Sequence, residues 1–470
     1  MNMLVRNIVS ILAASSLLCA CDSQLDIVPK GQSTLEKTED VELLLNQQYS
    51  FTIFPYVDLG LLCGESLGMT MSIPETLSTP NTLNYAYLTF DEGIDRATLC
   101  QADERYNAIY RYVNYMNTVI AKIDAASGLD SEKPRIKAEA RVVRSYLHWL
   151  AACIYARQYD DALPDDTGGI AYVTDINPSA VKEKLPLKEV YRLILDDCSD
   201  EVIALLPDDN SNVCRADRAF GYAVRAKVLM QMKRYADAAP YALRSIELNG
   251  HIDDRSPLAV GGDWTLSRNY AGNSLYIGCG PLICPTMEVI GKETMAKFEK
   301  NDYILKYAGD SGWNSTMGKI YSGISNTWIY NGWSTQGNPY GITSDRMYYV
   351  AAECLIRTGD ITGGLELVDK VRACRVENAS SYADMASMFP LDEKTAMALM
   401  RQAKYVECIG TYENFFDLKR WNSETNYRTV VTRDLGEFGS FTLSPDSPLW
   451  IFPFPANAVR YNPTMTQNYK

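Results

Sequence analysis

The sequence contains only two histidines, His148 and His251, so a Ser–His–Asp or Cys–His nucleophile would have to be built on one of them. His148 lies beside Trp149 in a stretch with helical apolar periodicity, which favours a core or subsurface histidine. Two histidines also exclude a histidine-rich metal site. The chain has neither a GxxxxGK nor a GxGxxG motif for nucleotide phosphates. Histidine catalysis and nucleotide binding are therefore unsupported.

Neighbouring aspartates are the remaining catalytic option, because a glycosidase needs only two carboxyl groups several ångströms apart. The pairs are Asp160-Asp161, Asp165-Asp166, Asp196-Asp197, Asp208-Asp209 and Asp253-Asp254. Most flank predicted turns or helix ends, where aspartate serves as a cap or a solvated charge. Asp160, Asp165 and Asp166 could bind calcium, but their spacing matches no calcium loop. We therefore expect no catalytic residue, no cofactor and no metal site, and keep a glycosidase as the less favoured alternative.

Aromatic and amide side chains crowd the segment from His251 to Ser344, which has little helical periodicity and many glycines. A long segment of this kind is usually functional or disordered, and disordered segments are poor in aromatics. Flat aromatic rings can bury the apolar face of a sugar, while asparagine pairs with its hydroxyl groups. We therefore predict that this segment binds a glycan. The candidate ligand-binding residues are Trp313, Trp328, Trp333, Tyr276, Tyr330 and Asn331.

The same chemistry would also suit an oligopeptide, and any one tryptophan of the segment could instead fill the helical scaffold. A weaker version of the pattern occurs in residues 81–87, NTLNYAY, within a stretch that we expect to be loops. The residues alone leave these alternatives open.

A helical hairpin is predicted for residues 215–250, where apolar residues recur at the spacing of one helical face on each side of a polar break. Small residues at Ala226 and Ala238 would let the two helices approach closely, with Tyr235 wedged at the turn. The stretch resembles a tetratricopeptide hairpin, which needs neighbouring hairpins to bury its apolar surface.

Two further stretches supply candidate neighbours for this hairpin. In residues 345–375, Ala352 and Gly364 repeat the small-residue spacing, and residues 137–162 match it more weakly. These hairpins predict a mainly α fold, in which a tetratricopeptide-like scaffold carries a long, irregular, loop-rich ligand-binding insertion at about 251–344.

Other parts of the chain complete the expected architecture. Further helices are expected at residues 39–48, 103–126, 131–159, 187–206, 392–409 and 413–421. Residues 50–99 are rich in Pro, Thr, Ser and Asn and are expected to be loops. From Pro445 onward the chain is expected to be extended, with Trp450-Ile451-Phe452 as a short strand or a core plug.

The acidic balance of the chain argues against nucleic acid as a partner, because a net charge of −13 leaves no basic surplus to neutralise phosphates. The twelve cysteines include no CxxC pair, which excludes a zinc ribbon and a thioredoxin-type site. Most lie at apolar helical positions and are expected to be free, buried thiols. Cys279 and Cys284 are close enough in sequence to form a disulfide, and the sequence does not decide whether they do.

Residues 1–20 are predicted to be a secretory signal, since a short start carrying Arg6 precedes an apolar run that is too short to span a bilayer. The run ends in LCAC, which resembles the lipobox of bacterial lipoproteins; Cys21 would then carry a diacylglyceryl group. Residues 21–38 are expected to be a lipidated tether and residues 39–470 a single globular domain, held at the membrane only through this lipid anchor.

The order of motifs along the chain resembles the SusD/RagB family of outer-membrane nutrient-binding lipoproteins. The matching places are the lipobox with Cys21, Leu25-Asp26 and Pro29; Ala138-Glu139-Ala140-Arg141 opening a helix that ends at Tyr159-Asp160-Asp161; the hairpin at 215–250; Asp345-Arg346 with Ala351-Ala352-Glu353 and Val371-Arg372; Glu413 to Trp421; and Trp450 to Tyr469. ENFFDLKRW at 413–421 looks like the family's hRwfDLkRw segment. The C-terminal segment looks like its PIP…E…N…QN..Y ending, although Phe454 and Ala458 replace polar or acidic residues common there.

The resemblance implies an α-helical tetratricopeptide-like scaffold with an irregular ligand-binding face. It also implies a TonB-dependent barrel transporter of the SusC type as partner, over which the protein acts as a lid. Family members share no fixed set of ligand residues, so the resemblance assigns none here. We expect a lipid-anchored protein of the outer membrane, exposed at the cell surface, that captures a glycan without chemistry. The alternatives are an oligopeptide ligand, a lipoprotein glycosidase and a scaffold that binds only other proteins.

Overall fold

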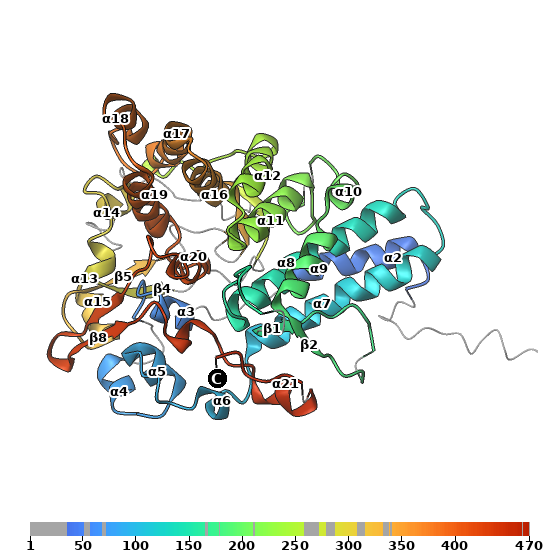
Figure 1. Cartoon of the computed structure of the whole chain (residues 1–470), viewed down its shortest axis with the longest axis horizontal. Coiled ribbons are helices and arrows are strands. Elements are labelled where there is room, and N and C mark those ends of the chain that lie inside the picture. Colours follow the sequence, from blue (N-terminus) through green and yellow to red (C-terminus); the bar gives the residue numbers. More distant parts are fainter. Residues whose placement is uncertain are drawn as a thin grey trace, which may run out of the picture.

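The structure is a computed structural model that describes residues 35–50, 57–67, 72–164, 168–177, 179–209, 212–257, 272–278, 287–307, 315–331, 338, 341–462 and 464–469. These residues form mainly helices, which confirms the predicted mainly α fold (Figure 1). Their strands pair only as antiparallel two-stranded sheets.

The helices and 3₁₀ turns of the first half are α2 (Thr38–Glu42), η2 (Leu43–Ser50), α3 (Val57–Leu62), α4 (Ile73–Leu77), α5 (Leu83–Thr89), α6 (Arg96–Leu99), α7 (Glu104–Lys122), η3 (Ile123–Ala125), α8 (Lys133–Tyr155), α9 (Leu187–Asp197), α10 (Asp200–Ile203), α11 (Arg218–Gln231) and α12 (Tyr235–Leu248). Those of the second half are α13 (Lys292–Met295), α14 (Tyr303–Tyr307), α15 (Ser315–Ser322), α16 (Ser344–Arg357), α17 (Ile361–Ala373), α18 (Tyr382–Met388), α19 (Glu393–Glu407), α20 (Glu413–Asn422), η7 (Gly436–Phe438), η8 (Pro448–Trp450) and α21 (Ala456–Tyr461). The paired strands are β1 (Gly168–Ala171) with β2 (Lys184–Pro186), β3 (Ser274–Tyr276) with β6 (Ile342–Thr343), β4 (Met287–Gly291) with β5 (Thr327–Asn331), and β7 (Val431–Asp434) with β8 (Ser440–Leu443).

The first predicted hairpin is confirmed as α11 and α12. Asp217 caps α11, since its carboxylate accepts a hydrogen bond from the Phe220 N–H at 2.8 Å. Ala226 and Ala238 are both fully buried, so their small side chains do allow the close approach of the two helices. Tyr235 is buried at the turn, as the pattern predicts.

The second hairpin is confirmed as α16 and α17. Gly359 has a φ of +97° at the turn, a left-handed conformation that favours glycine. A Cβ atom at Gly364 would lie 2.8 Å from the Ala352 carbonyl oxygen, which explains why a residue without a side chain stands there. The hairpins stack through α12 against α16, and α11 continues the stack to α8 and α9. In Figure 1 these helices form an arc from α7 to α18, and α3–α6 with α13–α15 lie below its left half.

The third predicted hairpin is wrong. Residues 133–155 form one helix, α8, and the chain then runs irregularly to β1. Asp160, Asp161 and Pro164 follow the helix, and such residues favour turns over a second helix. α8 packs instead against α7 and α9, and the Ser145 hydroxyl donates to the Ile194 carbonyl of α9 at 3.0 Å.

Three other expectations need correction. Residues 50–99 are not all loops, because they contain α3 to α6, helices too short to show a periodic pattern. Residues 187–206 form two helices, α9 and α10, separated at Cys198 and Ser199. The described part of the insertion at 251–344 is also less irregular than predicted, since it contains β3 to β6 and α13 to α15.

One hydrophobic core runs through the helices, with buried members from Val41 to Met465. Trp450 and Phe452 belong to this core, so of the two predicted alternatives for this segment the core plug is confirmed and the strand is not. The eight cysteines in the described ranges are all free, and all but the half-buried Cys374 are buried, as expected.

A buried ion pair joins α16 to α20 within this core. Arg420 on α20 donates two hydrogen bonds of 2.7 Å to Glu353 on α16, and neither side chain has exposed surface. Trp421 adds an N–H bond to Glu353 at 2.8 Å, and Asp417 accepts from Arg420 at 2.9 Å. Burial would raise the pKa of Glu353, but the charge of Arg420 and its hydrogen bonds outweigh it and lower the pKa to about 2.

Glu353→Gln should lower the free energy of unfolding by about 3 kcal/mol, because it leaves a buried guanidinium without its full countercharge. Urea denaturation at pH 7 measures the loss. Arg192→Met serves as control, because Arg192 forms only exposed ion pairs with Glu189 and Asp196 and its removal should leave the midpoint unchanged. Equal effects of the two substitutions would contradict the role of the buried pair.

Candidate functional site

The β4–β5 hairpin carries Trp328, the one predicted binding tryptophan that lies in the described ranges. Trp328 stands opposite Ile290 in the antiparallel register. Its ring is half-buried and packs on a small hydrophobic cluster that includes Ile290, Phe298 and Val406. Part of the indole surface therefore remains open to a ligand while the rest is supported by the core.

α15 packs directly on β5 and holds the strand in place. A Cβ atom at Gly318 would lie 2.2 Å from the Thr327 carbonyl oxygen, so the helix approaches the strand at a glycine. The hydroxyls of Ser322 and Thr327 lie 2.8 Å apart in a buried hydrogen-bond network. On its outer side α15 exposes apolar surface, with Ile320 64% and Met317 37% exposed.

α4 and α5 lie next to this unit although they come from far away in the sequence. A Cβ atom at Gly323, just after α15, would lie 2.8 Å from Pro74 of α4. Residues 81–87 form mostly α5 rather than the predicted loop, and Thr82 caps the helix. Asn81 and Asn84 are exposed there, and Tyr85 is half-buried.

Arg433 binds the C-terminal end of α5, a role that the sequence pattern did not predict. Its buried guanidinium donates to the carbonyl oxygens of Tyr87, Leu88 and Leu61. These carbonyls lie at the last turns of α5 and α3, where the helix dipole favours a cation. Burial lowers the pKa of Arg433 to about 10, so the group stays charged at neutral pH. Arg433 thus joins the C-terminal ends of α3 and α5.

Tyr276 is a core residue and has to be withdrawn from the predicted binding set. It lies on β3, is 1% exposed, and its ring stacks on Phe220 at 4.2 Å. β3 is paired with β6 and covered by the helices, which leaves the ring no surface for a ligand.

The remaining predicted site residues stay predictions. Tyr330 and Asn331 belong to β5, where they stand opposite Glu288 and Met287. Trp313, Trp333, the lipidation site Cys21 and the pair Cys279 and Cys284 lie outside the described residues.

His148 is a core residue, and backbone hydrogen bonds to both of its ring nitrogens leave neither available as a base. Its ring is fully buried and stacks on Tyr172 at 3.9 Å. Nε2 accepts the Val173 N–H at 3.0 Å, so Nδ1 carries the proton and donates it to the Arg144 carbonyl at 3.0 Å. Burial, followed by the charge of Arg144, lowers the pKa of His148 to about 3.

The aspartate pairs act mainly as structural charges. Asp197 is buried and accepts from Arg144 at 2.7 Å, and Asp160 pairs with Lys233 at 3.1 Å. Asp165 and Asp166 lie outside the described residues. In the part of the chain that the structure covers, no cluster of His, Cys, Asp and Glu is placed to hold a metal ion.

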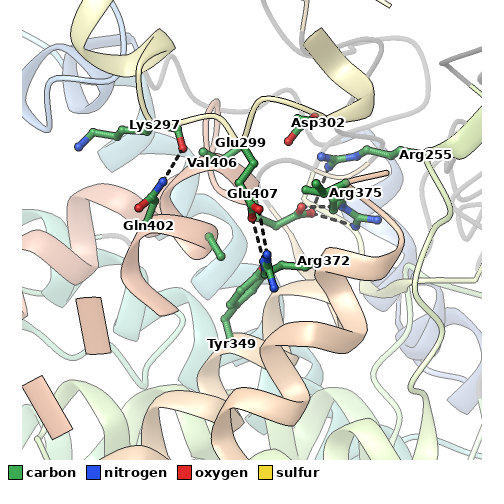
Figure 2. A pocket seen from close by; sticks show the side chains of 12 residues that line it. Arg255, Lys297, Glu299, Asp302, Tyr349, Arg372, Arg375, Gln402, Val406 and Glu407 are labelled. Carbon is green, nitrogen blue, oxygen red and sulfur yellow. Dashed lines mark hydrogen bonds and ion pairs between the residues drawn. The ribbon is translucent and has the colours of Figure 1, made fainter. Parts of the chain in front are cut away.

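A cluster of arginines and glutamates between α14, α17 and α19 could be mistaken for a polar binding site (Figure 2). Arg375 donates to Glu407 at 2.7 Å, Arg255 donates to the same carboxylate at 3.1 Å, and Arg372 pairs with Glu299 at 2.8 Å. The free space among these side chains is about 20 Å³, room for roughly one water. The charges therefore neutralise one another and join the elements; they leave no space for a sugar.

Comparison with known families identifies the class of protein. A family model described as "Starch-binding associating with outer membrane" matches residues 33–230, and the SusD family model matches residues 291–470. The chain belongs to the SusD/RagB family. No curated protein matches it.

Solved structures share the fold of this chain at low sequence identity. A putative sugar binding protein from Bacteroides vulgatus has a TM-score of 0.67 at 14% identity, over 93% of this chain and 99% of that chain. Surface glycan-binding protein A from Bacteroides uniformis has a TM-score of 0.67 at 13% identity, over 92% and 99%. Surface glycan-binding protein A from Bacteroides thetaiotaomicron has a TM-score of 0.63 at 15% identity, over 93% and 100%.

The buried, neutral His148 should make stability fall on acidification. In the unfolded chain its pKa returns to about 6.5, so the unfolded state binds a proton that the folded state refuses, and stability is lost as the pH falls from 6.5 towards 3. Between pH 7 and pH 4.5 this contributes a loss of about 2 kcal/mol. Urea denaturation of the wild type and His148→Gln at both pH values measures it. The variant should lose that much less stability than the wild type; parallel losses would contradict the assignment.

Proposed function

We propose that the protein is a cell-surface lipoprotein that binds a glycan and delivers it to a TonB-dependent outer-membrane transporter of the SusC type. Membership of the SusD/RagB family carries the proposal, because one matching family model is described as starch-binding and associated with the outer membrane. Fold neighbours with glycan-binding and sugar-binding names support it.

The surface around β5 supports a glycan as the ligand. It combines the half-buried Trp328 and the exposed apolar side of α15, and α4, which lies against the end of α15, packs on α5 with the exposed amides of Asn84 and the preceding Asn81. An aromatic ring beside amide groups suits a sugar, which needs both an apolar contact and hydrogen-bond partners. The protein acts by binding alone in this proposal: among the described candidates for an acid or base, His148 is buried, and Asp197 and Asp160 are held in ion pairs.

Trp328→Ala should weaken glycan binding about tenfold, because an aromatic contact adds about 1 kcal/mol or more to area burial. Affinity electrophoresis against a panel of polysaccharides measures the change. Tyr461→Ala is the matched control, since Tyr461 is 70% exposed on the separate helix α21. Circular dichroism checks the fold of both variants, and Trp328→Phe should keep most of the affinity.

Other results of this experiment would favour the alternatives. Unchanged binding by Trp328→Ala would remove β5 from the site. Retention of peptides from a random library, with no polysaccharide retained, would favour an oligopeptide ligand. Release of reducing sugars during incubation would favour a glycosidase, and the aspartate pairs would then be the first residues to replace by asparagine.

Attachment to the membrane is proposed to depend on Cys21 alone. No helix among the described residues is long and apolar enough to cross a bilayer, and the LCAC sequence resembles a lipobox. Cys21→Ser should therefore move the protein from the membrane fraction to the soluble fraction, because about 0.8 kcal/mol is lost for each buried CH₂ of the acyl chains. Fractionation of cells expressing both forms measures this. A variant that stays in the membrane fraction would contradict lipid anchoring at Cys21.

A further inference from the structure

An open pocket lies between α13, α19 and the start of β7, close to the hydrophobic cluster on which Trp328 packs. Its free volume is about 530 Å³, large enough for a sugar residue. Two aromatic residues, Tyr405 and Trp421, form part of its wall, and two cations, Lys297 and Arg401, line it.

Arg401 has no carboxylate partner in the described part of the chain. Its guanidinium lies 4.3 Å from the centre of the Trp421 ring, and one N–H group donates to the Thr429 hydroxyl at 2.8 Å. Burial lowers the pKa of Arg401, although the buried carboxylates of Glu353 and Asp417 behind Trp421 oppose this. The group is thus held by an aromatic face and a neutral hydroxyl.

Lys297 is the second cation of the pocket, and within the described ranges it forms no ion pair either. Its ammonium group lies 4.7 Å from the centre of the Tyr405 ring. Figure 2 shows its side chain directed away from the neighbouring arginine–glutamate cluster. Partial burial, followed by the positive charge of Arg401, lowers the pKa of Lys297. Each cation therefore disfavours the charge of the other.

Arg401 and Lys297 are unusual because, among the described residues, neither a carboxylate nor a carbonyl oxygen binds their charged groups. Acidic residues outnumber basic ones by 58 to 45, and other buried arginines, such as Arg372, Arg375 and Arg420, each bind a carboxylate. Glu293 is the one carboxylate among the lining residues, so the lining keeps a net positive charge. The pocket has a place for a negative charge that the described residues do not supply.

We propose that this pocket binds the carboxylate or sulfate group of an acidic glycan. The inference rests on the proposed function, and it specifies the class of glycan. Tyr405 connects the two places, because it lines the pocket and packs on the same hydrophobic cluster as Trp328. A guanidinium and an ammonium group that line the same pocket supply positive charge and hydrogen-bond donors for such an anion.

The test compares acidic and neutral polysaccharides on the full chain. Affinity electrophoresis at low salt, about 50 mM NaCl so that charge interactions are little screened, uses polygalacturonate, alginate and chondroitin sulfate against laminarin, arabinan and fully methyl-esterified polygalacturonate, all at the same concentration in the gel. Arg401→Met and Lys297→Met remove one charge each while keeping an unbranched apolar side chain over the ring. Lys300→Met is the control, because Lys300 is exposed and lies outside the pocket lining.

We expect at least one acidic polysaccharide to be retained more strongly than the neutral ones. Each of the two pocket variants should weaken this retention about tenfold, as expected for loss of a charge-assisted hydrogen bond, and higher salt should weaken it in the wild type. Lys300→Met should bind as the wild type does. Lys297 keeps much of its surface in contact with solvent and forms no ion pair within the described ranges, so its variant tests the pocket even if Arg401→Met fails to fold.

The outcomes separate this inference from the proposed function. Retention of neutral polysaccharides only, or acidic retention that neither pocket variant reduces, would overturn the inference and leave glycan binding intact. Retention of no polysaccharide from either group would overturn glycan binding itself, and the inference with it.

Discussion

The ion pair between Glu353 and Arg420 is the constraint on which the rest of the structure depends. A charge without exposed surface must meet its partner in one geometry, because a misplaced partner leaves it desolvated and unpaired. Arg420 therefore sets the position of α20 against α16, and Asp417 on the same helix forms an ion pair with Lys404 of α19 at 2.6 Å. The ion pairs thus connect three helices, α16, α19 and α20. Hydrophobic burial drives these helices together, while the charges select the register in which they meet.

The position of α20 is passed on to the candidate site through hydrogen bonds. Asn414 of α20 donates to Glu65 at 2.6 Å, and the carboxylate of Glu65 also accepts the backbone N–H of Gly410. Two residues further on, the Leu67 N–H donates to the Val289 carbonyl of β4 at 2.7 Å. β4 pairs with β5, which carries Trp328. A half-buried aromatic ring is thereby connected to α20, a helix whose residues are all buried, and such support lowers the entropic cost of binding a ligand.

The helical scaffold could be predicted from the sequence because its hairpins bury one face at a regular spacing. Ala226 with Ala238 and Ala352 with Gly364 marked both close approaches correctly. The short helices α3 to α6 could not be predicted in this way, since they are stabilised by caps and long-range contacts, not by periodicity. For the aromatic segment, the sequence alone could not predict which rings are exposed. Tyr276 and Trp328 have similar neighbours in sequence, but pairing with β6 buries the first and the edge of the β4–β5 hairpin leaves the second half-open.

Among the described residues, cations bound at helix ends can be compared with Arg401 and Lys297, since neither kind has a carboxylate partner. Lys419 donates to the carbonyl oxygens of Cys153 and Ala156 at 2.7 Å, at the end of α8, and Arg433 does the same for α3 and α5. Carbonyl oxygens at a helix end replace the carboxylate in these cases, so the N–H donors are satisfied within the fold. Arg401 and Lys297 have no such helix end: the first meets one hydroxyl and an indole ring, the second a phenol ring. An aromatic face supplies only part of the stabilisation that such a charge loses on leaving water. Lys419 and Arg433 have their N–H groups bound by carbonyl oxygens, whereas Arg401 and Lys297 keep N–H groups that an anion in the pocket can bind.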